Sequence, residues 1–145
     1  MINTFVKDLE LGNKYEKLLI EYLGYDDAKI MDGCFKDYDI EININNTMTY
    51  FEVKADRLTH KTNNICIEFE CSNKPSGITT TKANHYAYYE IIDETKYNLY
   101  MIPVSRIKKY IILNKYHRII NGGHNYNCKL YLFNKIIFSK YLINV

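Results

Sequence analysis

The sequence predicts a single α/β domain whose elements follow the order helix, three strands, helix and strand. Residues 8–23 carry an apolar stripe at helical spacing, formed by Leu11, Tyr15, Leu18, Leu19 and Tyr22. Residues 36–44 and 48–55 instead alternate polar and apolar side chains, a period of two that is typical of strands with one buried face. With 145 residues, of which 47% are hydrophobic, the chain can bury one core.

The predicted first helix ends at Gly24 and offers one acidic side chain to the sheet. Glu16 lies beside Leu19 at the edge of the apolar stripe, whereas Glu10 points to the far side. We therefore expect Glu16, and not Glu10, to reach a site at the sheet edge. The alternative is that Glu16 is an ordinary boundary residue that pairs with a lysine.

Asn45 and Asn46 separate the two alternating segments and predict a two-residue hairpin loop. In that register Asp39 lies directly across from Glu52, with Cβ atoms about 5 Å apart. Two carboxylates at this spacing repel each other, and a divalent cation between them would relieve the repulsion. Lys54 shares their face. The register is conditional, because a loop of another length would change the partner or the face.

Residues 64–70 predict a third strand, in which Glu68 and Glu70 face the same side. Either carboxylate could join a metal shell, although an exposed edge face explains both equally well. Residues 72–90 then pass from a Pro/Gly loop into a predicted helix that begins near Thr79 or Thr80. Beside the exposed amides of its N-terminus lie the predicted phosphate contacts Ser76, Thr81 and Lys82.

Charge is divided unevenly along the chain. Residues 1–104 hold all 17 acidic residues and 11 of the 19 basic residues, a net charge of −6, whereas residues 105–145 carry eight basic residues and no acid. After a predicted strand over residues 97–104 comes a short basic helix, whose predicted nucleic-acid contacts are Arg106, Lys108 and Lys109. The alternative is a solvated, lysine-rich surface.

The four cysteines, Cys34, Cys66, Cys71 and Cys128, show no spacing typical of a zinc site. We expect reduced, buried thiols in an intracellular, cytoplasmic protein, which would lie within the host cell if the source is viral. The N-terminal segment carries acidic residues where a secretory signal would be apolar, and no segment is apolar for long enough to cross a bilayer. No membrane partner is expected.

Glu16 on a helix, Asp39 on a strand and Glu52-Val53-Lys54 on the next strand resemble the PD-(D/E)xK nuclease superfamily. This superfamily includes restriction endonucleases, Holliday junction resolvases and many phage nucleases. The resemblance covers roughly residues 8–104, with residues 105–145 as a basic extension of the same domain. It implies a restriction-endonuclease-like αβββαβ core, in which a mixed central sheet is flanked by helices. Tyr38 stands where the family frequently has Pro.

The resemblance also implies residue roles. Asp39, Glu52, Glu16 and the backbone of Val53 would hold Mg²⁺ or Mn²⁺, and Lys54 would assist the attacking water. The predicted function is thus a metal-dependent endonuclease that hydrolyses phosphodiester bonds in DNA, with Asp39, Glu52, Lys54 and Glu16 as catalytic residues. A homodimer is compatible with this activity, because cutting both strands commonly needs two sites.

Two other functions stay open at this point. The first is a nucleic-acid-binding or inhibitory module that kept a nuclease fold and lost cleavage. The second is a structural or interaction protein in which Glu52 and Lys54 form a surface ion pair. The sequence does not distinguish DNA from RNA, a branched substrate from a duplex, or one metal ion from two.

Overall fold

The structure is a computed structural model that describes residues 4–33, 35 and 37–143. A six-stranded mixed sheet has the order β1 (Lys29–Ile30), β2 (Ile40–Ile44), β3 (Thr47–Asp56), β6 (His85–Ile91), β7 (Tyr97–Pro103) and β10 (Leu142–Ile143). A four-stranded antiparallel sheet has the order β5 (Lys74–Pro75), β4 (Asn64–Cys71), β9 (Cys128–Asn134) and β8 (Arg118–Gly122). Within the first sheet β3 and β6 are parallel, and the other neighbours are antiparallel.

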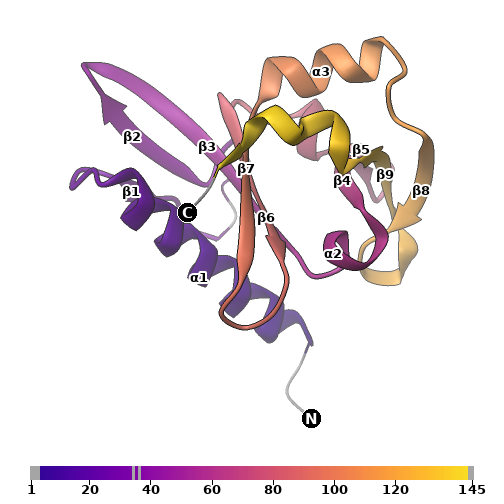
Figure 1. Cartoon of the computed structure of the whole chain (residues 1–145), viewed down its shortest axis with the longest axis horizontal. Coiled ribbons are helices and arrows are strands. Elements are labelled where there is room, and N and C mark those ends of the chain that lie inside the picture. Colours follow the sequence, from indigo (N-terminus) through magenta and orange to yellow (C-terminus); the bar gives the residue numbers. More distant parts are fainter. Residues whose placement is uncertain (1–3, 34, 36, 144–145) are drawn as a thin grey trace.

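Helices are few in the described part of the chain. The α-helices are α1 (Thr4–Leu23), α2 (Thr59–Thr62) and α3 (Val104–Ile112), and short 3-10 turns cover Gly77–Thr79, His124–Tyr126 and Lys135–Tyr141. The long helix α1 crosses one side of the six-stranded sheet, while β4, β8 and β9 gather on the other side (Figure 1). No helix among the described residues is both long and apolar enough to cross a membrane.

Two hydrophobic cores separate three layers. The first lies between α1 and the six-stranded sheet, where Tyr15 and Leu19 of the helix meet Phe51, Ala87 and Leu99. The second lies between the two sheets and includes Ile65, Ile67, Tyr86, Ile102 and Phe133. The six-stranded sheet is therefore covered on both faces, by a helix on one and by the second sheet on the other.

The hairpin predicted at Asn45 and Asn46 is confirmed. Both residues have positive φ angles, 50° and 65°, as a two-residue hairpin turn requires, and Ile44 pairs with Thr47. The pairing continues to Ile40 opposite Phe51, and at the next position the Asp39 amide donates to the Phe51 carbonyl, so the ladder ends before the predicted Asp39–Glu52 pair. Asparagine tolerates this left-handed conformation better than other residues that carry a side chain, glycine having none.

The predicted α/β class with helices on both faces of the sheet is wrong, because the fold is mostly β and built on two sheets. The error arises at the helix expected from Thr79 or Thr80. There the chain makes a 3-10 turn at Gly77–Thr79 and then enters β6. Six of the seven β6 residues are buried, because β6 is covered on both faces, so its sequence lacks the alternation of a half-exposed strand. Small and aromatic residues at helical spacing then mimic a helix.

Two smaller predictions are also corrected. The apolar stripe of α1 is narrower than expected, since Tyr15 and Leu19 are buried but Tyr22 is 45% exposed. Cys71 and Cys128 form a disulfide between β4 and β9, so reduced thiols are wrong for this pair. Cys66 is a free thiol whose pKa burial raises to about 12, and Cys34 lies outside the described residues.

We predict that Asn46→Val destabilises the protein by about 1 kcal/mol or more, because a β-branched side chain is strained at a positive φ. Asn43→Val is the matched control, since Asn43 is exposed within β2 itself, where a β-branched residue is favourable. Urea unfolding of both variants measures the difference. Equal stability of the two variants would contradict the hairpin geometry.

A cluster of carboxylates as candidate functional site

Asp39 occupies the position just before β2 and is fixed by its backbone and by its side chain. Its amide donates to the Phe51 carbonyl at 2.9 Å, and its own carbonyl accepts from Met31 at 2.8 Å. Side-chain atom Oδ2 accepts a hydrogen bond from the Val53 amide at 2.8 Å. This bond orients the carboxylate along β3 and leaves the second oxygen, Oδ1, free of a hydrogen bond to the described residues.

Glu52 lies on β3 with a side chain that is only 12% exposed. Lys54 Nζ lies 3.2 Å from Glu52 Oε1, and the Thr81 hydroxyl donates to Oε2 at 3.4 Å. Burial raises the pKa of Glu52, Lys54 opposes that shift and Asp39 adds to it. Burial disfavours the charge of Lys54, but Glu52 and Asp39 outweigh it and raise the lysine pKa. The pair is therefore ionic, with a buried acid and a half-exposed base.

Glu16 reaches the same cluster from α1. Burial, followed by the charges of Asp39 and Glu52, raises its pKa to about 7, while Lys54 lowers it. The charges of Asp39 and Glu52 therefore act on Glu16, and its membership of one site with them stays a prediction. Three carboxylates and one ammonium leave two negative charges uncompensated when all of them are ionised. The cluster can hold a proton on Glu16 or a cation.

Tyr86 adds a hydroxyl that the sequence did not reveal. It stands beside Glu52 in the parallel register of β3 and β6, and it is 1% exposed. Its hydroxyl has no hydrogen-bond partner among the described residues. Burial raises its pKa, and Glu52, Glu68 and Asp39 add to the shift. A buried hydroxyl without a partner costs free energy unless a further group satisfies it. Sequence reasoning missed it because this segment was expected to be helical.

A hollow of about 410 Å³ opens beside Glu52 and Lys54. Glu68, Cys71 and Ser76 also line it. The Ser76 hydroxyl is buried and has no hydrogen-bond partner in the described structure. Of the predicted phosphate contacts, the structure thus brings Ser76 and Thr81 to the cluster.

The other predicted contacts lie elsewhere or are engaged. Lys82 Nζ lies 3.6 Å from Asp37 Oδ2, and Arg106 lies over the ring of Tyr110. Lys108 lines a separate hollow with Phe69 and Ile111. Among the contacts of the described residues, none joins Arg106, Lys108 or Lys109 to the acidic cluster. Glu70 pairs with Lys129 at 3.1 Å, which leaves Glu68 as the further carboxylate near the cluster.

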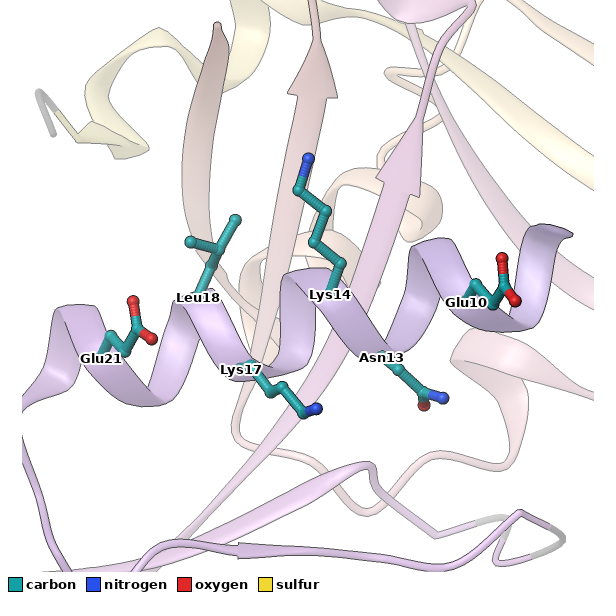
Figure 2. A pocket seen from close by; sticks show the side chains of 6 residues that line it. All are labelled: Glu10, Asn13, Lys14, Lys17, Leu18 and Glu21. Carbon is teal, nitrogen blue, oxygen red and sulfur yellow. The ribbon is translucent and has the colours of Figure 1, made fainter. Parts of the chain in front are cut away.

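A larger hollow of about 530 Å³ runs along α1, and Figure 2 shows that the same helix supplies all the side chains that line it. These are Glu10, Asn13, Lys14, Lys17, Leu18 and Glu21. Opposite charges four residues apart, as at Glu10 and Lys14, are ordinary stabilising pairs on an exposed helix face. None of the predicted site residues lines this hollow, and Glu10 indeed faces away from the cluster.

Comparison with known proteins gives one distant likeness. No protein-family model matches the chain, and no solved structure matches it. Interleukin-33 of the dog, Canis lupus familiaris, is 27% identical to it over 114 aligned residues. The alignment covers 63% of this chain, and the chain spans 43% of the length of that relative.

This likeness is to a cytokine, and it contradicts the predicted metal-dependent endonuclease. The predictions of a hydrolase, a phage nuclease and a Holliday junction resolvase are wrong on the same finding. The alternative of an inactive nucleic-acid-binding module fits the finding no better. The resemblance to the PD-(D/E)xK superfamily finds no support in these comparisons. The geometry of the carboxylate cluster is independent of them.

We predict a pH-dependent stability that originates at Glu16. Its pKa of about 7 in the folded protein, against an ordinary 4.5, means that the folded chain binds more protons between these values. The contribution of Glu16 to the free energy of unfolding is therefore present below pH 4.5 and is lost as the pH rises through about 7.

Glu16→Gln removes this titration. The free energy of unfolding of the variant should therefore fall less than that of the wild type between pH 4.5 and about pH 7. Urea unfolding at a series of pH values, without divalent ions, measures the effect. Glu10→Gln on the exposed face of α1 is the control and should follow the wild type. An unchanged pH profile for Glu16→Gln would refute the raised pKa of Glu16.

Proposed function

We propose that the protein binds a divalent cation between Glu16, Asp39 and Glu52. The observation that carries this proposal is the raised pKa of Glu16, about 7, to which burial contributes most and the charges of Asp39 and Glu52 contribute next. Lys54 offsets one of three negative charges, and a dication balances the two that remain. The unpartnered Tyr86 hydroxyl gives independent support, because it could donate to a water or an anion on the ion.

Oxygen ligands favour Mg²⁺ or Mn²⁺ over softer ions. Asp39 would offer Oδ1, since the Val53 amide already occupies Oδ2. Thr81 holds Glu52 in place through Oε2, so that the carboxylate keeps its orientation when the cation competes with Lys54 for Oε1. The Val53 amide orients Asp39, and the backbone of Val53 as a ligand of the cation stays a prediction. A bound cation supplies positive charge, and it can also hold water or an anionic group.

The first test is direct titration of the protein with Mn²⁺, followed by electron paramagnetic resonance or calorimetry. We expect one site, whose affinity falls at least about tenfold in Asp39→Asn and in Glu52→Gln, because each change removes a charged ligand. Affinity should also rise as the pH increases through about 7, where Glu16 loses its proton.

Glu10→Gln is the matched control, because Glu10 lies on the same helix as Glu16 but faces solvent. It should bind Mn²⁺ like the wild type. Equal weakening by Glu10→Gln would indicate nonspecific attraction by the acidic part of the chain. Full affinity in both Asp39→Asn and Glu52→Gln would sink the proposal.

A second candidate function is supported by the likeness to Interleukin-33, namely a signalling protein that is recognised by a cell-surface receptor. Several large apolar side chains are exposed, as protein interfaces require, among them Ile112 (78%) and Ile136 (74%). This candidate needs no reaction, and it is compatible with a bound cation.

Labelled protein incubated with canine cells that respond to Interleukin-33 tests this second candidate. We expect saturable binding that excess unlabelled Interleukin-33 displaces. Ile112→Asp would place a charge on the exposed apolar surface of α3, and Glu10→Gln is the control for the opposite surface. Binding that does not saturate, or that Interleukin-33 leaves unchanged, would exclude a shared receptor.

Three further expectations stay predictions. They are DNA as a partner, a homodimer and a cytoplasmic location. No hydrogen bond or ion pair among the described residues joins Arg106, Lys108 or Lys109 to the carboxylate cluster.

A further inference from the structure

A second group of metal-ligating side chains lies at the end of the four-stranded sheet. Cys71 on β4 pairs directly with Cys128 on β9, and the two form a disulfide. One carboxylate oxygen of Glu68 and the two sulfur atoms all lie within 4.8 Å of one another. Two cysteines and one carboxylate form a ligand set that suits zinc, unlike the all-oxygen cluster around Asp39.

A β-bulge explains how Glu68 joins this group. In a regular strand, residues three apart such as Glu68 and Cys71 face opposite sides. Here the pairing with β9 shifts between Glu68, opposite Leu130, and Glu70, opposite Lys129, which inserts an extra residue. The bulge thus turns Glu68 toward the cysteine pair. Bulges that re-aim a side chain in this way are frequent beside functional sites.

Two glycines let the chain pack tightly around the group. A Cβ at Gly77 would meet the carbonyl oxygen of Glu68, and the φ angle there is +52°. A Cβ at Gly123, where φ is +71°, would lie 2.8 Å from the sulfur of Cys128. Both positions therefore require glycine on two grounds, conformation and space. Close packing at Gly77 fixes the backbone of Glu68, and close packing at Gly123 fixes the side chain of Cys128.

We propose that Glu68, Cys71 and Cys128 bind one zinc ion when the Cys71–Cys128 disulfide is reduced. Three protein ligands leave a fourth position, which opens to the hollow lined by Ser72, Lys74 and Ser76. Zinc bonds of about 2.0–2.3 Å hold ligand atoms farther apart than two bonded sulfur atoms, so the sulfur atoms of Cys71 and Cys128 move apart once the disulfide is reduced. The half-buried Glu68 side chain can rotate toward them.

The exchange between the two forms begins with reduction of the disulfide. A dithiol reductant transfers two electrons and two protons to it, so that the disulfide becomes two thiols and the reductant becomes a disulfide. Zinc then binds the two thiolates, and two protons are released to the solvent. A disulfide oxidant reverses the exchange: it takes two electrons from the two thiolates and two protons from the solvent and becomes a dithiol, while the thiolates rejoin as the disulfide and release the zinc ion. The site therefore exists in a disulfide form and in a zinc form, and the two exclude each other.

The test compares the full chain in its oxidised form and after reduction with a phosphine that does not ligate zinc. We expect zinc binding with a stoichiometry of one in competition with a chromophoric chelator, and only after reduction. Cobalt in place of zinc should give the sulfur-to-metal charge-transfer band that carboxylate sites cannot give. This band separates the proposed site from the cluster at Asp39.

Matched variants sharpen the test. Cys71→Ser and Cys128→Ser should weaken zinc binding by about 100-fold or more and Glu68→Gln by about tenfold. Cys66→Ser is the control for the thiols, because the Cys66 thiol lies outside the group and keeps its proton. Glu70→Gln is the control for Glu68, because Glu70 already pairs with Lys129. Glu52→Gln should leave the cobalt band intact.

Circular dichroism of each reduced variant shows whether it is folded, and Glu68→Gln tests the site even if a cysteine variant unfolds. The proposal is overturned if the reduced wild type shows no cobalt–sulfur band. It is equally overturned if the oxidised protein gives the same band, or if Glu70→Gln and Cys66→Ser weaken zinc binding as much as their counterparts do.

Discussion

The parallel pairing of β3 with β6 is the constraint on which the rest of the structure depends. β6 is buried on both faces, with Tyr86 and Tyr88 in the core between the sheets and Ala87 and Tyr89 in the core under α1. The same register sets Glu52 beside Tyr86. A shift of one residue would turn the apolar side chains of β6 toward the wrong cores and move the Tyr86 hydroxyl away from Glu52. The backbone hydrogen bonds between β3 and β6 thus set both the packing of the two cores and the position of Tyr86 beside Glu52.

Local sequence was sufficient to predict the hairpin and the carboxylates it carries. Two asparagines with positive φ set the loop length, and alternation then fixed which side of β3 Glu52 faces. β6 could not be predicted in the same way, because a strand that is buried on both faces has no alternation to detect. Nor could the pairing of Cys71 with Cys128, which are separated by 57 positions in the sequence and meet only through the β4–β9 ladder. Both β6 and the disulfide depend on pairing between segments that are distant in the sequence, which local residue patterns do not reveal.

Glu68 lies between two sites of different chemistry. It adds to the negative field on Tyr86 and Lys54, and it also approaches the sulfur atoms of Cys71 and Cys128. The hollow that contains Glu52 and Lys54 extends to Glu68 and Cys71. In the proposed zinc form the two thiolates balance the charge of the ion, so Glu68 would keep its negative charge near Lys54 and Tyr86 while binding the metal.

The ion pair between Lys54 and Glu52 does not remove the need for a further positive charge. Lys54 is 43% exposed, so solvent screens it, and an ion pair of this kind contributes about 0–1 kcal/mol. Glu52 is nearly buried, and burial penalises its charge. Repulsion among Glu16, Asp39 and Glu52 can be relieved by a proton on Glu16 or by a cation among all three. Because both relieve the same repulsion, the proposed cation would compete with the proton on Glu16 near neutral pH.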